Sequence, residues 1–188
     1  MGKEFRKAAG KIEYCDEIVK TKWGNFMAIR QGSLWGLVNE DYEEILPVCY
    51  EEVSTFPNGC IGVKKNGKWG LVNVRGEEII RCEYDNVDGE FCGDYVRVEL
   101  GGKKGLVYKD GEMVVPCKYD DIGTCPSEYI VVCLGGKWGI VNEEGDEVVP
   151  CIYDSVVEVE EHPEEGYAEF KIDGKTCRIY DKGEMYWD

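Results

Sequence analysis

The chain has 188 residues, with 22 Lys and Arg against 38 Asp and Glu, so its formal net charge is −16. A field of that sign repels nucleic-acid phosphates and anionic lipid headgroups, so we expect no nucleic-acid partner and no membrane partner. The first ten residues are polar, and no apolar run reaches the roughly 18 residues of a membrane helix, which predicts a cytoplasmic protein.

A seven-residue motif recurs along the chain. Its clearest copy is Gly-Lys-Trp-Gly-Leu-Val-Asn at residues 67–73, and residues 136–142 repeat it with one aliphatic exchange. The glycine of the Trp-Gly pair falls at positions 36, 70, 105 and 139, in steps of 34, 35 and 34 residues. Residues 174–180 are a degenerate last copy. A fixed period in this range predicts a repeat architecture.

Each copy begins with two predicted strands joined by a tight hairpin. Alternating apolar residues precede turn pairs such as Asn66-Gly67 and Asp173-Gly174, whose types accept a positive φ. Aligned on the turn glycine, the first copy is expected to bury Phe26 and Ala28. In the second strand, the glycine after each Trp is expected to leave room for a large ring from a neighbouring strand or repeat.

A second glycine-containing turn and a third strand follow in each copy. The third strand ends in Pro at positions 47, 116 and 150, which indicates an edge position because Pro cannot donate to a ladder. Next comes Tyr-Glu or Tyr-Asp, in a short fourth strand or an extended connection. The segments 19–24, 54–59, 88–93, 123–128 and 157–165 are interpreted as loops to the next copy. We find no helical period.

The two ends of the chain complement each other. Residues 11–18 resemble the end of a repeat, and the chain finishes inside a third strand at Trp187. The fold expected first is therefore all-β, a single domain over residues 1–188 forming a five-bladed β-propeller-like ring. Its units are approximately 19–53, 54–87, 88–122, 123–156 and 157–188, the last completed by 11–18. The alternative is an open solenoid or stacked-hairpin array.

Cysteine, histidine and acidic residues are the side chains that could bind a metal or take part in catalysis. Cys82, Cys117 and Cys151 share one repeat position and are expected to be reduced, buried core residues. His162 is the only histidine and no Cys-x-x-Cys occurs, so we expect no metal and no cofactor. One acid per repeat suggests turn chemistry rather than catalysis, and we expect no enzyme activity. These acids are Glu51, Asp85, Asp120 and Asp154.

Four residues outside the repeat pattern are the candidate binding site. Trp23, Phe56 and Phe91 lie in the predicted loops, and His162 lies in the longer last one. Loops of stacked repeats commonly share one face, where exposed aromatic rings bind partners. The alternative is that these rings cap the ends of neighbouring strands.

The combination of motifs resembles the WG-repeat family, also called KWG repeats. The resemblance rests on Gly-Lys-Trp-Gly at 67–70 and 136–139, the Val-Asn that follows, the Val-Val-Pro step and the Tyr-Asp close, over about residues 12–187. Such repeats occur mostly in bacterial proteins and are taken as binding or structural modules. The resemblance therefore implies a bacterial protein without a catalytic residue.

These observations predict a monomeric, non-enzymatic scaffold that binds another protein through its inter-repeat loop face. The acidic charge favours a partner with a basic surface. Two alternatives remain open at this stage, a carbohydrate-binding module and a small propeller hydrolase.

Overall fold

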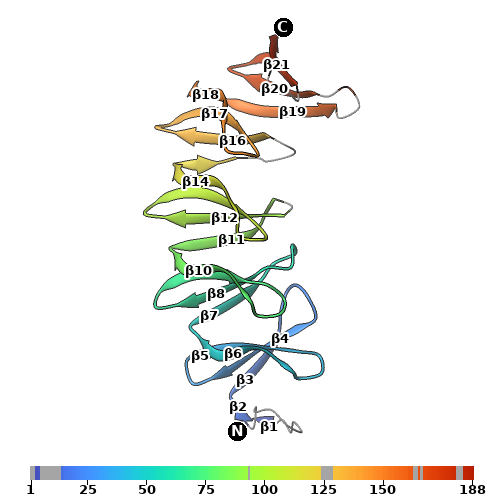
Figure 1. Ribbon diagram of the computed structural model, residues 1–188, viewed down its shortest axis with the longest axis vertical. Helices are drawn as coiled ribbons and strands as arrows, with labels where there is room; N and C mark the ends of the chain where they lie inside the picture. Colours follow the sequence, from blue (N-terminus) through green and yellow to red (C-terminus); the bar gives the residue numbers. More distant parts are fainter. Residues whose placement is uncertain are drawn as a thin grey trace. The chain divides into compact units, whose positions relative to one another are not determined.

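The structure is a computed structural model that describes residues 3–4, 14–92, 94–123, 129–162, 165, 167–180 and 184–188. These residues form strands and turns without a helix, so the all-β prediction is confirmed (Figure 1). Within the same ranges, the chain has no helix with the length and apolar character needed to cross a bilayer.

Five four-stranded sheets follow one another along the sequence, each with its strands in chain order. The first contains β3 (Glu17–Lys20), β4 (Phe26–Gln31), β5 (Leu34–Asn39) and β6 (Glu44–Tyr50). The second contains β7 (Glu52–Thr55), β8 (Ile61–Lys65), β9 (Lys68–Val72) and β10 (Glu78–Tyr84). The third contains β11 (Asn86–Cys92), β12 (Tyr95–Leu100), β13 (Lys103–Tyr108) and β14 (Met113–Tyr119).

The last two sheets and a short ribbon complete the fold. The fourth sheet contains β15 (Asp121–Ile122), β16 (Tyr129–Leu134), β17 (Lys137–Asn142) and β18 (Glu147–Tyr153). The fifth contains β19 (Val156–His162), β20 (Tyr167–Ile172), β21 (Lys175–Tyr180) and β22 (Met185–Trp187). A separate ribbon pairs β1 (Lys3–Glu4) with β2 (Tyr14–Cys15). The chain divides into two compact units, residues 1–100 with 107–112 and residues 101–106 with 113–188.

The hairpin between the second and third strands of each sheet is the predicted tight turn. Asn66 and Gly67 have φ of 55° and 74°, and Gly135 and Gly136 have 63° and 74°. Positive φ at both central residues defines a type I′ turn, whose twist matches that of the strands. No other heavy atom lies within 4 Å of the β-carbon position of Gly67 or Gly136, so these hairpin tips are open to solvent.

The first copy is shifted by one residue from the predicted alignment. Ile29 pairs with Gly36, just as Val63 pairs with Gly70. Ile29 is accordingly buried, whereas Phe26 and Ala28, which were expected in the buried columns, are half-buried. The turn glycine of this copy, Gly32, occupies the first turn position instead of the second. An alignment on the turn glycines therefore assigns the residues of the preceding strand to positions that are wrong by one.

The glycine of the Trp-Gly pair faces a bulge in the fourth strand, not an aromatic ring as predicted. In the fourth sheet Trp138 pairs with Tyr153 and Ile140 with Val149, so one residue of β17 opposes three of β18. A β-carbon at Gly139 would lie 2.5 Å from the Val149 carbonyl oxygen. The first and second sheets have the same shift opposite Gly36 and Gly70. The glycine therefore makes room for backbone.

The fifth sheet shows what happens when this glycine is replaced. Cys177 stands in its place and is fully buried. Opposite it, β22 pairs without a shift, with Cys177 facing Trp187 and Ile179 facing Met185. A side chain at this position and a bulge in the fourth strand thus exclude each other.

Most of the segments that were interpreted as loops begin the sheets as strands. Val19 and Lys20 belong to β3, Ser54 and Thr55 to β7, residues 88–92 to β11 and residues 157–162 to β19. These strands lie at sheet edges, where charged residues are common and hide the apolar alternation. Residues 124–128 lie outside the described residues.

The N-terminal segment does not complete the last sheet in the way that the ring prediction required. Glu17 and Ile18 pair with β4 in the first sheet. The fifth sheet has four strands of its own, with β22 paired to β21. Residues 11–13 lie outside the described residues.

Successive sheets within a unit meet through the second turn of each repeat. A β-carbon at Gly111, in the turn before β14, would lie 2.9 Å from the carbonyl oxygen of Ile79 on β10. Gly145 stands even closer to the backbone of Val114 on β14, where a β-carbon would overlap the carbonyl oxygen. These glycines allow one sheet to seat against the strand before it.

Among the described residues, Cys49, Cys60, Cys82, Cys133, Cys151 and Cys177 are free thiols. Cys82, Cys117 and Cys151 are half-buried rather than fully buried, because they lie in the bulge beside the Trp-Gly glycine. Cys82 donates its S–H to the Val63 carbonyl, at 3.6 Å. Burial raises the pKa of all three thiols, as expected for core positions.

Cys60 is the thiol that we expect to be least reactive. Its side chain is buried, and burial raises its pKa to about 11. At pH 8 only about one thiolate in a thousand forms at that pKa, so iodoacetamide should label Cys60 after denaturation and not in the native protein. Peptide mass spectrometry measures this, and rapid native labelling at pH 8 would contradict the buried placement.

Candidate functional site

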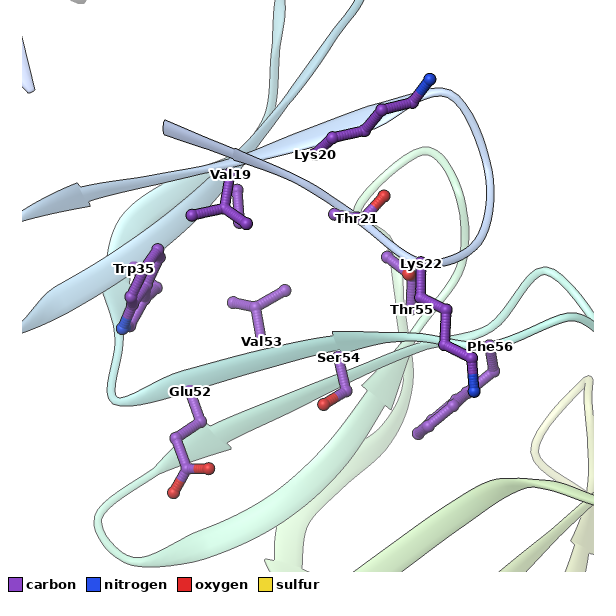
Figure 2. Close-up of a pocket in the computed structure, with 11 residues that line it drawn as sticks. Val19, Lys20, Thr21, Lys22, Trp35, Glu52, Val53, Ser54, Thr55 and Phe56 are labelled. Carbon is purple, nitrogen blue, oxygen red and sulfur yellow. The ribbon is translucent and has the colours of Figure 1, made fainter. Parts of the chain in front are cut away.

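A cavity of about 460 Å³ lies between the first and second sheets, inside the first unit (Figure 2). Val19 on β3 and Val53 on β7 face each other across it, and the Trp35 ring on β5 forms one end. The volume falls in the usual range of ligand pockets, about 300–1,000 Å³. The remaining lining residues are Lys20, Thr21, Lys22, Ala28, Glu52, Ser54, Thr55 and Phe56.

The loop after β3 is tied to β7 and fixes one wall of the cavity. The backbone N–H of Trp23 donates to Thr55 Oγ1 at 3.2 Å. The Thr21 hydroxyl lies as a donor 2.9 Å from the Trp23 carbonyl oxygen and 3.1 Å from that of Phe26. The cavity is therefore a built feature whose loop and strand walls are joined by hydrogen bonds.

The wall residues combine apolar surface with charge. The Trp35 ring is half-buried, with the Arg30 guanidinium 5.7 Å from its centroid on the cross-strand partner. Glu52 pairs with Lys64, with Nζ 2.6 Å from Oε1, so its charge is compensated. Lys22 reaches across the mouth toward Phe56 (Figure 2). The lining therefore contains two lysines, Lys20 and Lys22, and one acid, whose charge Lys64 compensates.

The structure brings together two of the four predicted site residues. Trp23 is 36% exposed and its ring lies 5.2 Å from Lys22 Nζ. Phe56 is only 9% exposed and lines the cavity. Phe91 belongs to β11, and its side chain lies outside the described residues. His162 ends β19 in the second unit, where it stacks on Tyr167 with ring centroids 4.5 Å apart.

Sequence reasoning missed the residues that shape the cavity, above all Val19, Thr21 and Trp35. Trp35 was treated as one of several equivalent motif residues. Val19 was placed in a loop. A signal was nevertheless present, because the second repeat has Phe56 directly after its first strand and the first repeat has Thr21 there.

The acids that recur once per repeat perform the turn chemistry predicted for them. Glu51 accepts the N–H of Gly67 at 3.0 Å, and Asp120 accepts that of Gly135 at 2.6 Å. Lysines at the start of a third strand pair with the acid that precedes the next sheet. These pairs are Lys68 with Asp85, Lys103 with Asp120, and Lys137 with Asp154.

The Asp120 pair predicts a defined pH dependence. The hydrogen bond from Lys103, with that from the Gly135 N–H, lowers the pKa of Asp120 below its ordinary 3.8. Because the folded-state pKa is depressed, this stabilisation is complete above pH 3.8 and is lost as the pH falls through the lower folded value. Asp120→Asn should therefore lower Tm at pH 7, and the deficit should shrink below pH 3.8. Lys103→Met should behave alike, and a deficit independent of pH in both variants would contradict the pairing.

Metal-binding residues do not gather in the described part of the chain. There, no group of three His, Cys, Asp or Glu side chains is placed to hold a metal ion. The site geometry thus consists of an aromatic and aliphatic cavity with lysines at its rim.

Five sheets of one plan, each built on the same recurring motif, define an all-β repeat protein. The sequence profile described as "WG containing repeat" matches residues 35–69, 69–103, 105–138 and 138–175. The chain belongs to the WG-repeat family, as the motif resemblance indicated. No curated protein matches the chain at a significant level.

Several solved structures share part of the arrangement at low identity. A eukaryotic initiation factor has 8% identity and a TM-score of 0.44, over 98% of this chain and 54% of that one. The dihydro-heme d1 dehydrogenase NirN has 13% identity and a TM-score of 0.36, over 91% and 46%. A TolB protein from Agrobacterium tumefaciens has 10% identity and a TM-score of 0.31, over 93% and 81%. The chain spans about half the length of the first two.

Proposed function

We propose that the protein is a non-enzymatic scaffold that binds another protein, and that the cavity between β3 and β7 receives a side chain of this partner. The observation that supports this most is a preformed cavity with both apolar and polar walls beside β3, the edge strand of the first sheet. An edge strand offers backbone N–H and C=O groups to an extended segment. The net charge of −16 favours encounter with a partner that carries a basic surface.

Peptide-display selection tests this proposal. Random peptides should be enriched on the wild-type protein and should be lost on Val19→Glu, which places a charge on the cavity wall. Val74→Glu is the matched control, because Val74 is 45% exposed, Val19 is 44% exposed, and Val74 lies outside the cavity lining. Enrichment that Val19→Glu leaves intact, or no enrichment at all, would refute binding at this cavity.

A carbohydrate ligand is the second candidate. The Trp35 ring could stack on a sugar face, and the Ser54 hydroxyl lines the same cavity. A glycan array separates the two functions, since the protein-binding proposal expects no signal there. A glycosidase has less support, because it uses two carboxylates and Glu52, the acid in the lining, is paired with Lys64.

We further propose that the protein is a monomer and that the fifth sheet carries a polar outer face that no other sheet of the chain covers. The residue two positions after the motif Trp packs against the next sheet: Leu37 joins residues of the second sheet, and Ile140 those of the fifth. In the fifth sheet this position is Arg178, whose side chain is 34% exposed and pairs with Glu169 and Asp188 at 3.3 and 2.6 Å. A polar outer face is typical of a terminal repeat.

Arg178→Leu tests this polar outer face. If the outer face of the fifth sheet is a polar cap, the variant should self-associate in sedimentation velocity, because it exposes an apolar side chain. If this face packs on another sheet of the same chain, the variant should stay monomeric and gain stability, and the proposal of an uncovered polar face would be wrong.

A further inference from the structure

The space between the second and third sheets is filled by one ring, that of Phe56. This side chain follows β7, and its ring lies over Gly62 on β8 and Gly89 on β11. A β-carbon at Gly62 would lie 3.1 Å from Phe56 Cζ, and one at Gly89 would overlap the ring. The two glycines therefore make an aromatic-sized slot between sheets, and the chain fills this slot itself.

The strand pairings identify the corresponding slot between the first and second sheets. Phe56 and Thr21 are equivalent, because each donates its N–H to the residue that begins or precedes the next strand, Cys60 or Phe26. Ala28 pairs with Val19 as Gly62 pairs with Ser54, so Ala28 is the equivalent of Gly62. Val53 pairs with Val63 as Val87 pairs with Val98, so Val53 and Val87 are equivalent. Thr55 and Gly89 each lie two residues further along the strand and are therefore equivalent as well.

These equivalents are the residues that line the cavity. Thr21, Ala28, Val53 and Thr55 all belong to its wall. The cavity thus occupies the place that the Phe56 ring takes one repeat later, and it is open because Thr21 replaces the phenylalanine. Its apolar walls, Val19, Val53 and the Trp35 ring, suit an aromatic side chain from outside.

The charges at the mouth specify what should flank this aromatic side chain. Lys20 and Lys22 line the cavity, and its acid, Glu52, is paired with Lys64. A carboxylate next to the inserted ring would therefore approach a locally positive rim, whereas a lysine there would be repelled. This local preference is compatible with an overall basic partner, because steering by net charge acts over longer distances.

We propose that the partner segment is an extended peptide whose single aromatic side chain, flanked by acidic residues, enters the cavity and takes the place that Phe56 fills between the next two sheets. The segment lies along the edge of β3. This proposal rests on the proposed protein-binding function and names the chemistry of the partner.

A synthetic peptide with the sequence Thr-Val-Glu-Phe-Glu-Val-Thr tests the proposal by isothermal titration calorimetry on the full chain. Replacing its Phe by Ala should weaken binding about 10- to 100-fold, as expected for the loss of one buried aromatic side chain. Replacing both Glu by Lys should weaken binding roughly fivefold, with the effect decreasing at high salt.

A variant that fills the cavity with its own side chain, the self-plugging variant, provides the decisive test. Thr21→Phe combined with Ala28→Gly and Thr55→Gly reproduces the residue set of the next slot, so its own ring should occupy the cavity. This variant should remain folded by circular dichroism and lose the peptide, whereas the control Val74→Glu should bind as the wild type does.

The outcomes separate this inference from the function on which it rests. Peptides that are selected at the cavity but lack an aromatic residue would overturn the inference and leave protein binding intact. No cavity-dependent peptide at all would overturn both. Undiminished binding of the synthetic peptide by the self-plugging variant would also overturn the inference, since the ring would then bind elsewhere.

Discussion

Gly139→Ala is expected to lower the free energy of unfolding by about 3 kcal/mol, at the upper end of the usual cost of overpacking. The added β-carbon would lie 2.5 Å from the Val149 carbonyl oxygen and 2.8 Å from the Cys151 nitrogen. Both are backbone atoms of the bulge in β18, which cannot move aside as a flexible side chain would. Urea denaturation followed by tryptophan fluorescence measures the change as a lower midpoint.

Gly123→Ala is the control in the same sheet region. There a β-carbon would lie 3.4 Å from Val131 Cβ and 3.5 Å from a Trp138 ring carbon, which are ordinary contacts. The substitution should change the free energy of unfolding by less than about 1 kcal/mol. Equal effects of the two substitutions would show that the bulge does not determine the need for glycine at position 139.

Phe56→Ala is expected to cost about 3 kcal/mol, in the range of buried aromatic truncations. The ring is 9% exposed and fills the slot over Gly62 and Gly89, so its removal leaves a cavity that the two glycines cannot close. The thermal or urea unfolding midpoint of the variant reports this loss.

Trp23→Ala separates the two aromatic residues that the sequence treated as equivalent. Trp23 is 36% exposed and contributes its backbone N–H to Thr55, which alanine retains. We expect a loss below about 1 kcal/mol, as for most exposed positions. A larger loss for Trp23→Ala than for Phe56→Ala would contradict the packing described for both rings.

The repeat and its hairpins could be predicted because both depend on local chemistry. Positive φ at Asn66 and Gly67 follows from residue type, and a period of 34 or 35 residues can be counted directly. Glu51 and Asp120 were correctly assigned to turns, since one residue per repeat in the same register has one role.

The bulge, the edge strands and the cavity could not be predicted because they depend on pairing between strands. Opposite Gly139, three residues of β18 face one of β17, and nothing in either strand alone reveals this count. The edge strands show only a weak alternation of apolar and polar residues, because charged residues are acceptable at a sheet edge. The cavity requires that Thr21 and Phe56 be recognised as equivalent, which only the register of β3 and β7 establishes.

The two turns of each repeat differ in what surrounds them, and this difference determines which turn can accept inserted residues. No neighbouring heavy atom lies within 4 Å of the β-carbon position of Gly67 or Gly136, whereas Gly111 and Gly145 are seated on the backbone of the preceding sheet. Foreign peptides grafted into the former should therefore be displayed without disturbing the sheets, while the same grafts in the latter would separate neighbouring sheets.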